Sequence, residues 1–316
     1  MIERCDLEVD VSDGAPIGVR NIATRFVVDR DRWDGHTVLC CFPGGGMSSR
    51  YFELEGFDMA AYLADLGLAL LLVDHPGIGG SDVPDDGWEL TPEVVADADV
   101  AAVERSFDLL GLRDVEAIGL GHSMGSMLVA YQQAQHRPYQ GLVLAGFSGR
   151  GLPEVLTPAE QEIAGSADRI RSSVVELART RFGTPLVEST SSTLEMLVGP
   201  NVSAGVERAI QGSAGPLLAV CGLNALLPGS DEQVLTAVDV PVLLIVAEHD
   251  IVGPPHEAPR YFPGSPDLTL HVVSAAFHNS NIAPARTTMW ERIGSWAAWL
   301  VGAGRSPIGE GASHHE

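Results

Sequence analysis

Lysine is absent from the sequence, and all nineteen of its basic residues are arginines, against 42 acidic residues. At pH 7 the formal net charge is therefore −23. The averaged field of such a chain repels nucleic acid, anionic membrane surfaces and strongly anionic substrates. We expect a small uncharged substrate and neither a nucleic-acid nor a membrane partner.

Long apolar runs and cysteine are also scarce. No apolar run reaches the roughly 18 residues that span a bilayer, and residues 1–6 lack the basic and apolar blocks of a secretory signal. There are four cysteines, and only Cys40 and Cys41 are adjacent, so neither a metal spacing nor a disulfide framework is present. These features predict a cytoplasmic protein with reduced thiols and no metal.

The pattern of apolar runs predicts an α/β protein with a mostly parallel sheet. Apolar strands alternate with amphipathic helices, which is typical of parallel sheets covered by helices on both faces. Residues 6–11 and 19–28 alternate apolar and polar side chains, which predicts an antiparallel hairpin at the sheet edge. The expected later strands are 37–42, 68–73, 115–120, 142–145, 240–247 and 268–273, and the expected helices include 57–66, 92–110 and 285–301.

One long segment interrupts this alternation. Between about residues 150 and 236 no run resembles a strand, and helical stretches are expected over 157–181, 191–198 and 203–226. We therefore predict a helical cap inserted into an α/β core. The expected division is a core of 1–149 and 237–302, a cap of 150–236 and a flexible tail of 303–316.

A serine lies where an apolar strand meets a helix. The run 115–120 leads into Gly121-His122-Ser123-Met124-Gly125, and a helical pattern follows. Glycine two residues before and after a serine permits a sharp strand-to-helix turn, because a Cβ at either place would collide with its neighbours. The pattern predicts a nucleophile elbow that presents Ser123 at its tip.

The strand 37–42 ends in a loop with three consecutive glycines, Gly44, Gly45 and Gly46. Such a loop can turn backbone N–H groups toward a ligand. The phosphate-binding alternative is disfavoured, because no Gly-Lys-Ser/Thr follows and the spacing differs from a dinucleotide fingerprint. We expect no cofactor.

Together these features resemble the α/β-hydrolase fold superfamily over about residues 20–302. The resemblance rests on the elbow, the glycine-rich loop, an acid and a histidine after later strands, and the helical insertion. It implies that Ser123 is the nucleophile, His278 the base and Asp250 the acid that orients the base. It also implies an oxyanion hole formed by the N–H groups of Met124 and Gly45, with Gly46 as the alternative to Gly45.

Other histidines and acids are also candidates for these roles. His122 is expected to face away from the tip of the turn as a packing residue, and His271 to be structural within a strand. His249 and His256 flank Asp250, but their spacing is irregular and a fourth metal ligand is lacking. Glu248 and Asp267 compete with Asp250 for the role of the acid.

Three positions depart from the commoner family pattern. The oxyanion loop opens with Pro43-Gly44 instead of His-Gly, and Phe277 stands before the histidine instead of glycine. Proline also replaces arginine in Asp74-His75-Pro76-Gly77, which is similar to members that cleave carbon–carbon or carbon–halogen bonds. Halide or epoxide chemistry through an alkyl-enzyme ester is disfavoured, because Ser123 stands where those enzymes need aspartate.

We therefore predict a cofactor-independent serine hydrolase that cleaves a small or medium uncharged ester or lactone through an acyl-enzyme. The alternatives are a thioesterase, an acyltransferase or a carbon–carbon bond hydrolase with the same triad, and a non-catalytic or cyclase-like member of the fold. The oligomeric state stays open. The residues expected to line the pocket from the cap are Leu156, Phe182, Met196, Leu197 and Leu223.

Overall fold

The computed structural model describes residues 1–305 except 17, 189–196 and 201. An eight-stranded sheet runs through the described part in the order β1-β2-β6-β3-β7-β8-β11-β12. Strands β1 and β2 pair antiparallel, as do β2 and β6, and the remaining pairs are parallel. The bounds are β1 Ile2–Asp10, β2 Asn21–Asp29, β3 Thr37–Phe42, β6 Ala69–Val73, β7 Glu116–His122, β8 Leu142–Ala145, β11 Val242–Ala247 and β12 Leu268–Val273.

The central strands are apolar because both of their faces are covered. In β3, Val38 and Cys40 join one hydrophobic cluster, while Leu39 and Cys41 join a second. Successive side chains of a strand point to opposite faces, so the two clusters are the two sides of the sheet. The predicted α/β architecture with a mostly parallel sheet is confirmed.

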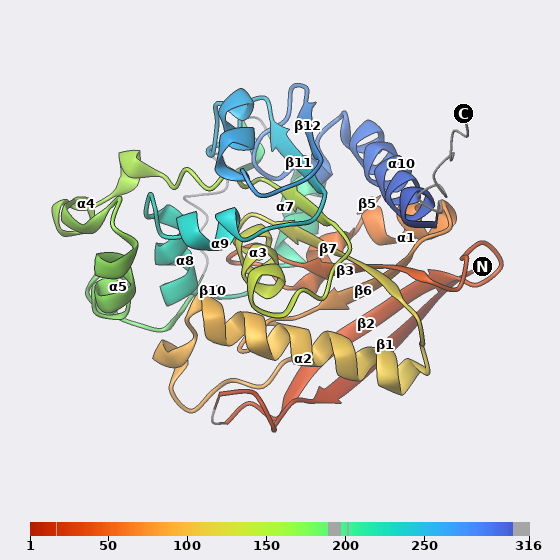
Figure 1. The fold of residues 1–316 in the computed structure, drawn as a ribbon, viewed down its shortest axis with the longest axis horizontal. Coiled ribbons are helices and arrows are strands. Elements are labelled where there is room, and N and C mark those ends of the chain that lie inside the picture. Colours follow the sequence, from red (N-terminus) through yellow and green to blue (C-terminus); the bar gives the residue numbers. More distant parts are fainter. Residues whose placement is uncertain (17, 189–196, 201, 306–316) are drawn as a thin grey trace, which may run out of the picture.

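Helices pack on both sides (Figure 1). Helices α2 (Pro92–Leu110) and α3 (Met124–His136) contribute to the first cluster, and α1 (Met59–Asp65) and α10 (Arg286–Arg305) to the second. The Oγ1 of Thr91 accepts the N–H of Val94 at the start of α2, and Gly111 ends that helix with a left-handed φ of 68°.

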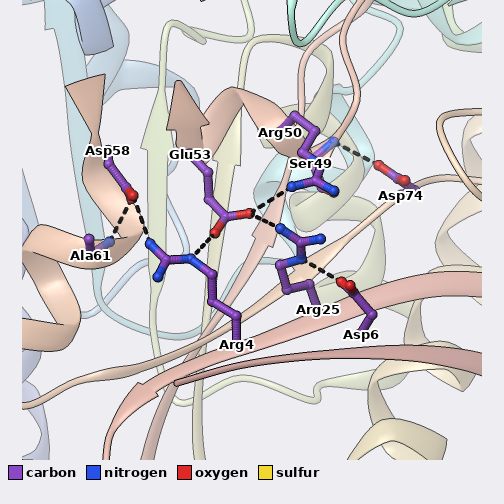
Figure 2. A network of polar contacts seen from close by, with 9 residues as sticks. All are labelled: Arg4, Asp6, Arg25, Ser49, Arg50, Glu53, Asp58, Ala61 and Asp74. Atoms are coloured by element: carbon purple, nitrogen blue, oxygen red, sulfur yellow. Dashed lines mark hydrogen bonds and ion pairs between the residues drawn. The ribbon is translucent and has the colours of Figure 1, made fainter. Parts of the chain in front are cut away.

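The N-terminal hairpin forms the sheet edge, as predicted, and an ion network ties it to the rest of the core. The buried carboxylate of Glu53 in β4 (Glu53–Leu54) accepts from Arg4 at 2.7 Å and from Arg25 at 2.9 Å (Figure 2). Arg4 also pairs with Asp58 of β5 (Phe57–Asp58), and Arg25 pairs with Asp6. Two arginines therefore join β1 and β2 to the β4–β5 hairpin.

The segment between β8 and β11 is mostly helical but more broken than the sequence suggested. The expected helix over 157–181 is interrupted at Gly165, whose N–H donates to the carbonyl of Pro228 and whose φ is +81°. The expected absence of strands is wrong, because β9 (Leu186–Val187) and β10 (Leu217–Leu218) pair antiparallel. The helices here are α4 Pro158–Ile163, α5 Ala167–Phe182, α7 Ala204–Gln211, α8 Ala219–Leu226 and α9 Glu232–Thr236.

The helical stretch expected over 191–198 lies largely outside the described residues, and the predicted domain boundaries stay predictions. The remaining short 3-10 helices are η1 Ser49–Phe52, η2 Gly87–Glu89, η3 Pro153–Val155, η5 Pro255–Tyr261 and η6 Ser280–Ile282. Within the described residues, every helix is too short or too polar to cross a bilayer. The loops after β3, β6, β7, β8, β11 and β12 share one edge of the sheet, because these strands are parallel.

Candidate active site

The turn between β7 and α3 presents Ser123. Its φ of 54° and ψ of −120° are strained values for a residue with a side chain. A Cβ on Gly121 would lie 2.4 Å from the backbone N of Ser126, and one on Gly125 would lie 2.3 Å from the carbonyl oxygen of Phe42. Glycine is therefore required on both sides of Ser123 for the helix to start this close to two strands.

The structure brings Ser123, His278 and Asp250 together. Ser123 Oγ lies 2.8 Å from His278 Nε2, and His278 Nδ1 lies 2.7 Å from Asp250 Oδ1. A carboxylate only accepts hydrogen bonds, so Nδ1 carries the proton and Nε2 accepts from the serine hydroxyl. The side chains of His278 and Asp250 are 4% and 1% exposed, which keeps water away from the pair.

Backbone groups hold the Asp250 carboxylate in its ionised form. The N–H groups of Ala247 and Val252 donate to its two oxygens at 3.2 and 3.3 Å. Burial disfavours the charge, but the neighbouring His278 and these donors outweigh burial and lower the pKa of Asp250. The carboxylate is thus kept as an acceptor for the imidazole.

The competing acids point elsewhere. The Glu248 carboxylate accepts the N–H of Ala275 at 2.8 Å. Asp267 directly precedes β12, at the opposite end of the strand from the histidine loop. His271 lies half-buried within β12, as expected of a structural residue.

His122 has a more specific place than the sequence suggested. Its ring is buried and stacks on Tyr51 with 4.5 Å between centroids, as a packing residue does. It does not simply face away from the site, because its Nε2 donates to the backbone carbonyl of His278 at 3.1 Å and it lines the adjoining cavity. Burial lowers the pKa of His122 to about 3, so the ring is neutral near pH 7.

The glycine-rich loop meets the start of α3 beside Ser123. Gly45 and Met124 both line the cavity, and the lining residues do not include Gly46. A Cβ on Gly45 would lie 2.4 Å from Leu217 Cδ1 and 3.6 Å from Met124 Sδ. Gly46 has a φ of +80°. This placement favours Gly45 over Gly46 as the second donor toward a bound carbonyl.

The far end of the glycine-rich loop is tied to the loop after β6. The Asp74 carboxylate accepts the N–H of Ser49 at 2.7 Å and the N–H of Gly80 at 2.9 Å (Figure 2 shows the contact with Ser49). A Cβ on Gly79 would lie 2.0 Å from Asp74 Oδ2. The acid of the Asp74-His75-Pro76-Gly77 motif therefore holds the glycine-rich loop to the loop after β6.

A cavity of about 220 Å³ opens over the serine, with a mostly apolar wall. From the segment between β8 and β11, Phe182 and Leu197 line it, as expected from the sequence. Leu156 and Leu223 instead pack in the hydrophobic cluster within that segment, and Met196 lies outside the described residues. The apolar lining residues that the sequence did not suggest include Met47, Phe147, Leu152, Leu217, Leu226, Ile251 and Val252.

Some of these residues had a signal in the sequence. Ile251 and Val252 follow the candidate acid, and Met47 closes the glycine-rich loop, so adjacency to a motif would have found them. Leu217 and Leu226 have no such signal, because they reach the cavity through the folding of a distant segment.

Among the described residues that line the cavity, Arg181 is the cation, and it is already paired. Arg181 donates to Glu160 Oε2 at 2.6 Å, and the Glu160 side chain is only 2% exposed. The pair leaves this part of the wall without net charge, so the wall favours uncharged ligands.

A parallel sheet with a strained serine turn, a histidine and a buried acid at its carboxyl edge defines an α/β protein of the hydrolase type. A family model described as alpha/beta hydrolase fold matches residues 37–284, and the chain belongs to this family. A search of curated proteins gives no match.

Solved structures show the same fold at low sequence identity. A thermophilic esterase from Thermogutta terrifontis is 20% identical with a TM-score of 0.60, covering 94% of this chain and 99% of its own. A monoacylglycerol lipase from Paleococcus ferrophilus is 16% identical with a TM-score of 0.61, covering 95% and 99%. A proline iminopeptidase from Mycobacterium smegmatis is 18% identical with a TM-score of 0.64, covering 95% and 100%.

Proposed function

We propose that the protein is a cofactor-independent serine hydrolase that cleaves small or medium uncharged carboxylic esters, including lactones. The observation that carries the proposal is the continuous chain from Ser123 Oγ through His278 to Asp250, with contacts of 2.8 and 2.7 Å, at the floor of an apolar cavity. Nucleophile, base and orienting acid within hydrogen-bond reach are the arrangement that acyl transfer needs.

In the first half of the reaction, Ser123 Oγ attacks the ester carbonyl while His278 Nε2 accepts the hydroxyl proton. Negative charge forms on the carbonyl oxygen, and the N–H groups of Met124 and Gly45 stabilise it. When the tetrahedral intermediate collapses, the carbon–oxygen bond of the ester breaks and His278 returns the proton to the departing alcohol. The product is an acyl-enzyme on Ser123.

In the second half, water attacks the acyl-enzyme with His278 as the general base. The same two N–H groups stabilise the second oxyanion, and collapse breaks the bond between the acyl carbon and Ser123 Oγ. The serine regains its proton and the carboxylic acid leaves. Throughout both halves, Asp250 stays ionised and stabilises the imidazolium as it forms.

The wall of the cavity supports the proposed substrate class. About 220 Å³ accommodates a small or medium acyl or alcohol group, and most of the wall is apolar. The Arg181–Glu160 pair adds no net charge. In this proposal the 150–236 segment acts as the cap, because Phe182, Leu197 and Leu226 contribute to the wall.

The experiment combines covalent labelling with turnover. A fluorophosphonate probe is expected to label the protein at Ser123, and the Ser123→Ala variant is expected to show no label. A panel of uncharged aryl esters, lactones and acyl thioesters then ranks the substrate classes by kcat/KM. Folded protein that is neither labelled nor active on any of them would overturn the proposal.

A further inference from the structure

A second buried histidine–carboxylate pair lies outside the reaction just described. His75, in the loop after β6, and Asp99, in α2, are both 0% exposed, and His75 Nδ1 lies 2.7 Å from Asp99 Oδ2. The other ring nitrogen, Nε2, lies 3.1 Å from the carbonyl oxygen of Pro43. Pro43 is the first residue of the glycine-rich loop that carries Gly45.

The contacts determine how many protons this pair holds. A backbone carbonyl only accepts, so His75 Nε2 must carry a proton to bond to Pro43. The 2.7 Å contact with Asp99 needs one further proton, whether it resides on the imidazole or on the carboxyl group. In either arrangement the pair is neutral overall and Nε2–H points at the loop.

The pair is held from its far side. Gln132 Nε2 donates to Asp99 Oδ2 at 3.0 Å, and the Tyr139 hydroxyl donates to Gln132 Oε1 at 2.6 Å. Each donor fixes the orientation of the next acceptor, so Asp99 is held in place for His75. The ring of Phe42 stacks on His75 with 5.9 Å between centroids.

The electrostatics of the site keep the bridging proton in place. Burial opposes a charge on the imidazole, but the Asp99 carboxylate outweighs it and raises the pKa of His75. Burial also raises the pKa of Asp99. Both shifts favour the protonated state of the pair.

The Pro43 carbonyl matters because it directly precedes the turn of the loop, in which the Met47 N–H donates to the Gly44 carbonyl at 3.2 Å. Proline has no N–H, and the three glycines after it are conformationally permissive. The same carbonyl packs closely on the elbow helix, since a Cβ on Gly125 would lie 2.5 Å from its oxygen. A hydrogen bond to this oxygen therefore fixes the peptide plane from which the chain proceeds to Gly45.

We propose that His75, oriented by Asp99, is a positioning residue for the oxyanion loop, which it holds through Nε2–H and the Pro43 carbonyl. The inference rests on the proposed hydrolase function, because its consequence is the direction of the Gly45 N–H at the oxyanion. Donors aimed in advance at the developing charge need no reorganisation during the reaction.

Two substitutions of His75 each keep one of the two hydrogen bonds of the ring and remove the other. In His75→Asn the amide reaches the place of Nδ1 and keeps the contact with Asp99, whereas in His75→Gln it reaches the place of Nε2 and keeps the bond to Pro43. We expect His75→Asn to lower kcat by roughly 10- to 100-fold, with KM changed by less than about threefold, because donors to the oxyanion act mainly in the transition state. His75→Gln is expected to retain most of the wild-type kcat.

Binding of an arylboronic acid, whose adduct with Ser123 mimics the tetrahedral intermediate, is expected to weaken in His75→Asn by a factor similar to the loss in kcat. Equal losses in the two variants, or a loss confined to KM, would overturn the inference. If the wild-type protein is neither labelled by a fluorophosphonate nor active on esters, the proposed function fails instead.

Two measurements test the hydrogen bond from His75 to the Pro43 carbonyl without turnover. Hydrogen–deuterium exchange of the peptide over 43–47 is expected to speed up in His75→Asn and to stay near the wild-type rate in His75→Gln. If both variants fail to fold, nitrogen NMR of the wild-type protein with labelled histidine decides. A proton on His75 Nε2 across the pH range of the folded state supports the hydrogen bond to the Pro43 carbonyl, and an unprotonated Nε2 contradicts it.

Discussion

The residue before the candidate nucleophile holds the loop that carries the candidate base. His122 Nε2 donates to the backbone carbonyl of His278 at 3.1 Å, and the two ring centroids lie 5.1 Å apart. Because Nε2 must keep its proton and burial disfavours a second one, His122 is a neutral ring buried beside the histidine that would become charged in the proposed reaction.

This environment predicts a loss of stability in acid. The pKa of His122 is lowered to about 3 in the folded protein, whereas an unfolded histidine titrates near 6.5. As pH falls from about 6.5 toward 3, His122 binds a second proton in the unfolded chain but not in the folded protein. The free energy of unfolding therefore decreases by up to about 1.4 kcal/mol per pH unit. His122→Gln keeps a donor for the carbonyl and is expected to remove this component.

Urea unfolding between pH 4 and 7 measures the difference between wild type and His122→Gln. His36→Gln at an exposed position is the matched control and is expected to leave the pH dependence nearly unchanged. Identical pH slopes for wild type and His122→Gln would show that His122 takes up its second proton over the same pH range in the folded and the unfolded protein.

The assignment of the acid is tested by Asp250→Asn. An amide can donate to His278 Nδ1 and so stabilise the tautomer whose Nε2–H faces Ser123, which leaves the serine without a base. We expect kcat on an aryl ester to fall by about 10³–10⁴-fold with the fold retained, as judged by circular dichroism. Glu248→Gln is the control, and a comparable loss there would move the acid to Glu248.

Much of the site was predictable because its signals are local. Ser123, Asp250 and His278 each follow a strand, and parallel strands end at one edge of the sheet, so order along the chain predicts proximity in space. The same reasoning predicted the hairpin at the sheet edge and the buried central strands, whose apolar patterns are continuous or alternate over a few residues.

Features that depend on distant partners were not predictable. The break at Gly165 comes from a hydrogen bond to Pro228, and no pattern near residue 165 indicates that partner. Likewise, Arg181 would be taken from the sequence as a charged surface residue, whereas Glu160 neutralises it in the cavity wall. His75 and Asp99 meet across 24 positions of the chain.

The glycine-rich loop, which we propose forms part of the oxyanion hole, predicts the effect of one substitution and of a second that reverses it. In Gly45→Ala the new Cβ would lie 2.4 Å from Leu217 Cδ1, so either Leu217 or the loop must move. We expect kcat to fall by roughly 10-fold or more, since displacement of the loop weakens one donor to the oxyanion. In Gly45→Ala with Leu217→Ala the space is restored and kcat is expected to recover in large part. If the losses in kcat of the two single variants add up in the double variant, the effect of Gly45→Ala comes from a change in the backbone and not from the contact with Leu217.

Another buried acid, Asp231, predicts a pH dependence of the opposite sign. Asp231 is 4% exposed and accepts from the Tyr131 hydroxyl at 3.1 Å and from Asn224 Nδ2 at 2.8 Å. Burial raises the pKa of Asp231 to about 7 despite these donors. An unfolded aspartate titrates near 3.9. The folded protein therefore holds a proton that the unfolded chain releases, and stability falls as pH rises from about 4 to 7.

Asp231→Asn is expected to remove this dependence, because an amide oxygen still accepts from Tyr131 and no charge has to be buried. The free energy of unfolding in urea, measured at intervals from pH 4.5 to 7.5, should show a wild-type decline relative to the variant of up to about 1.4 kcal/mol per pH unit. Asp168→Asn, at a side chain that is 91% exposed, is the control and should run parallel to wild type. If Asp231→Asn also runs parallel to wild type, Asp231 is ionised in the folded protein and the Tyr131 and Asn224 donors suffice to hold its charge.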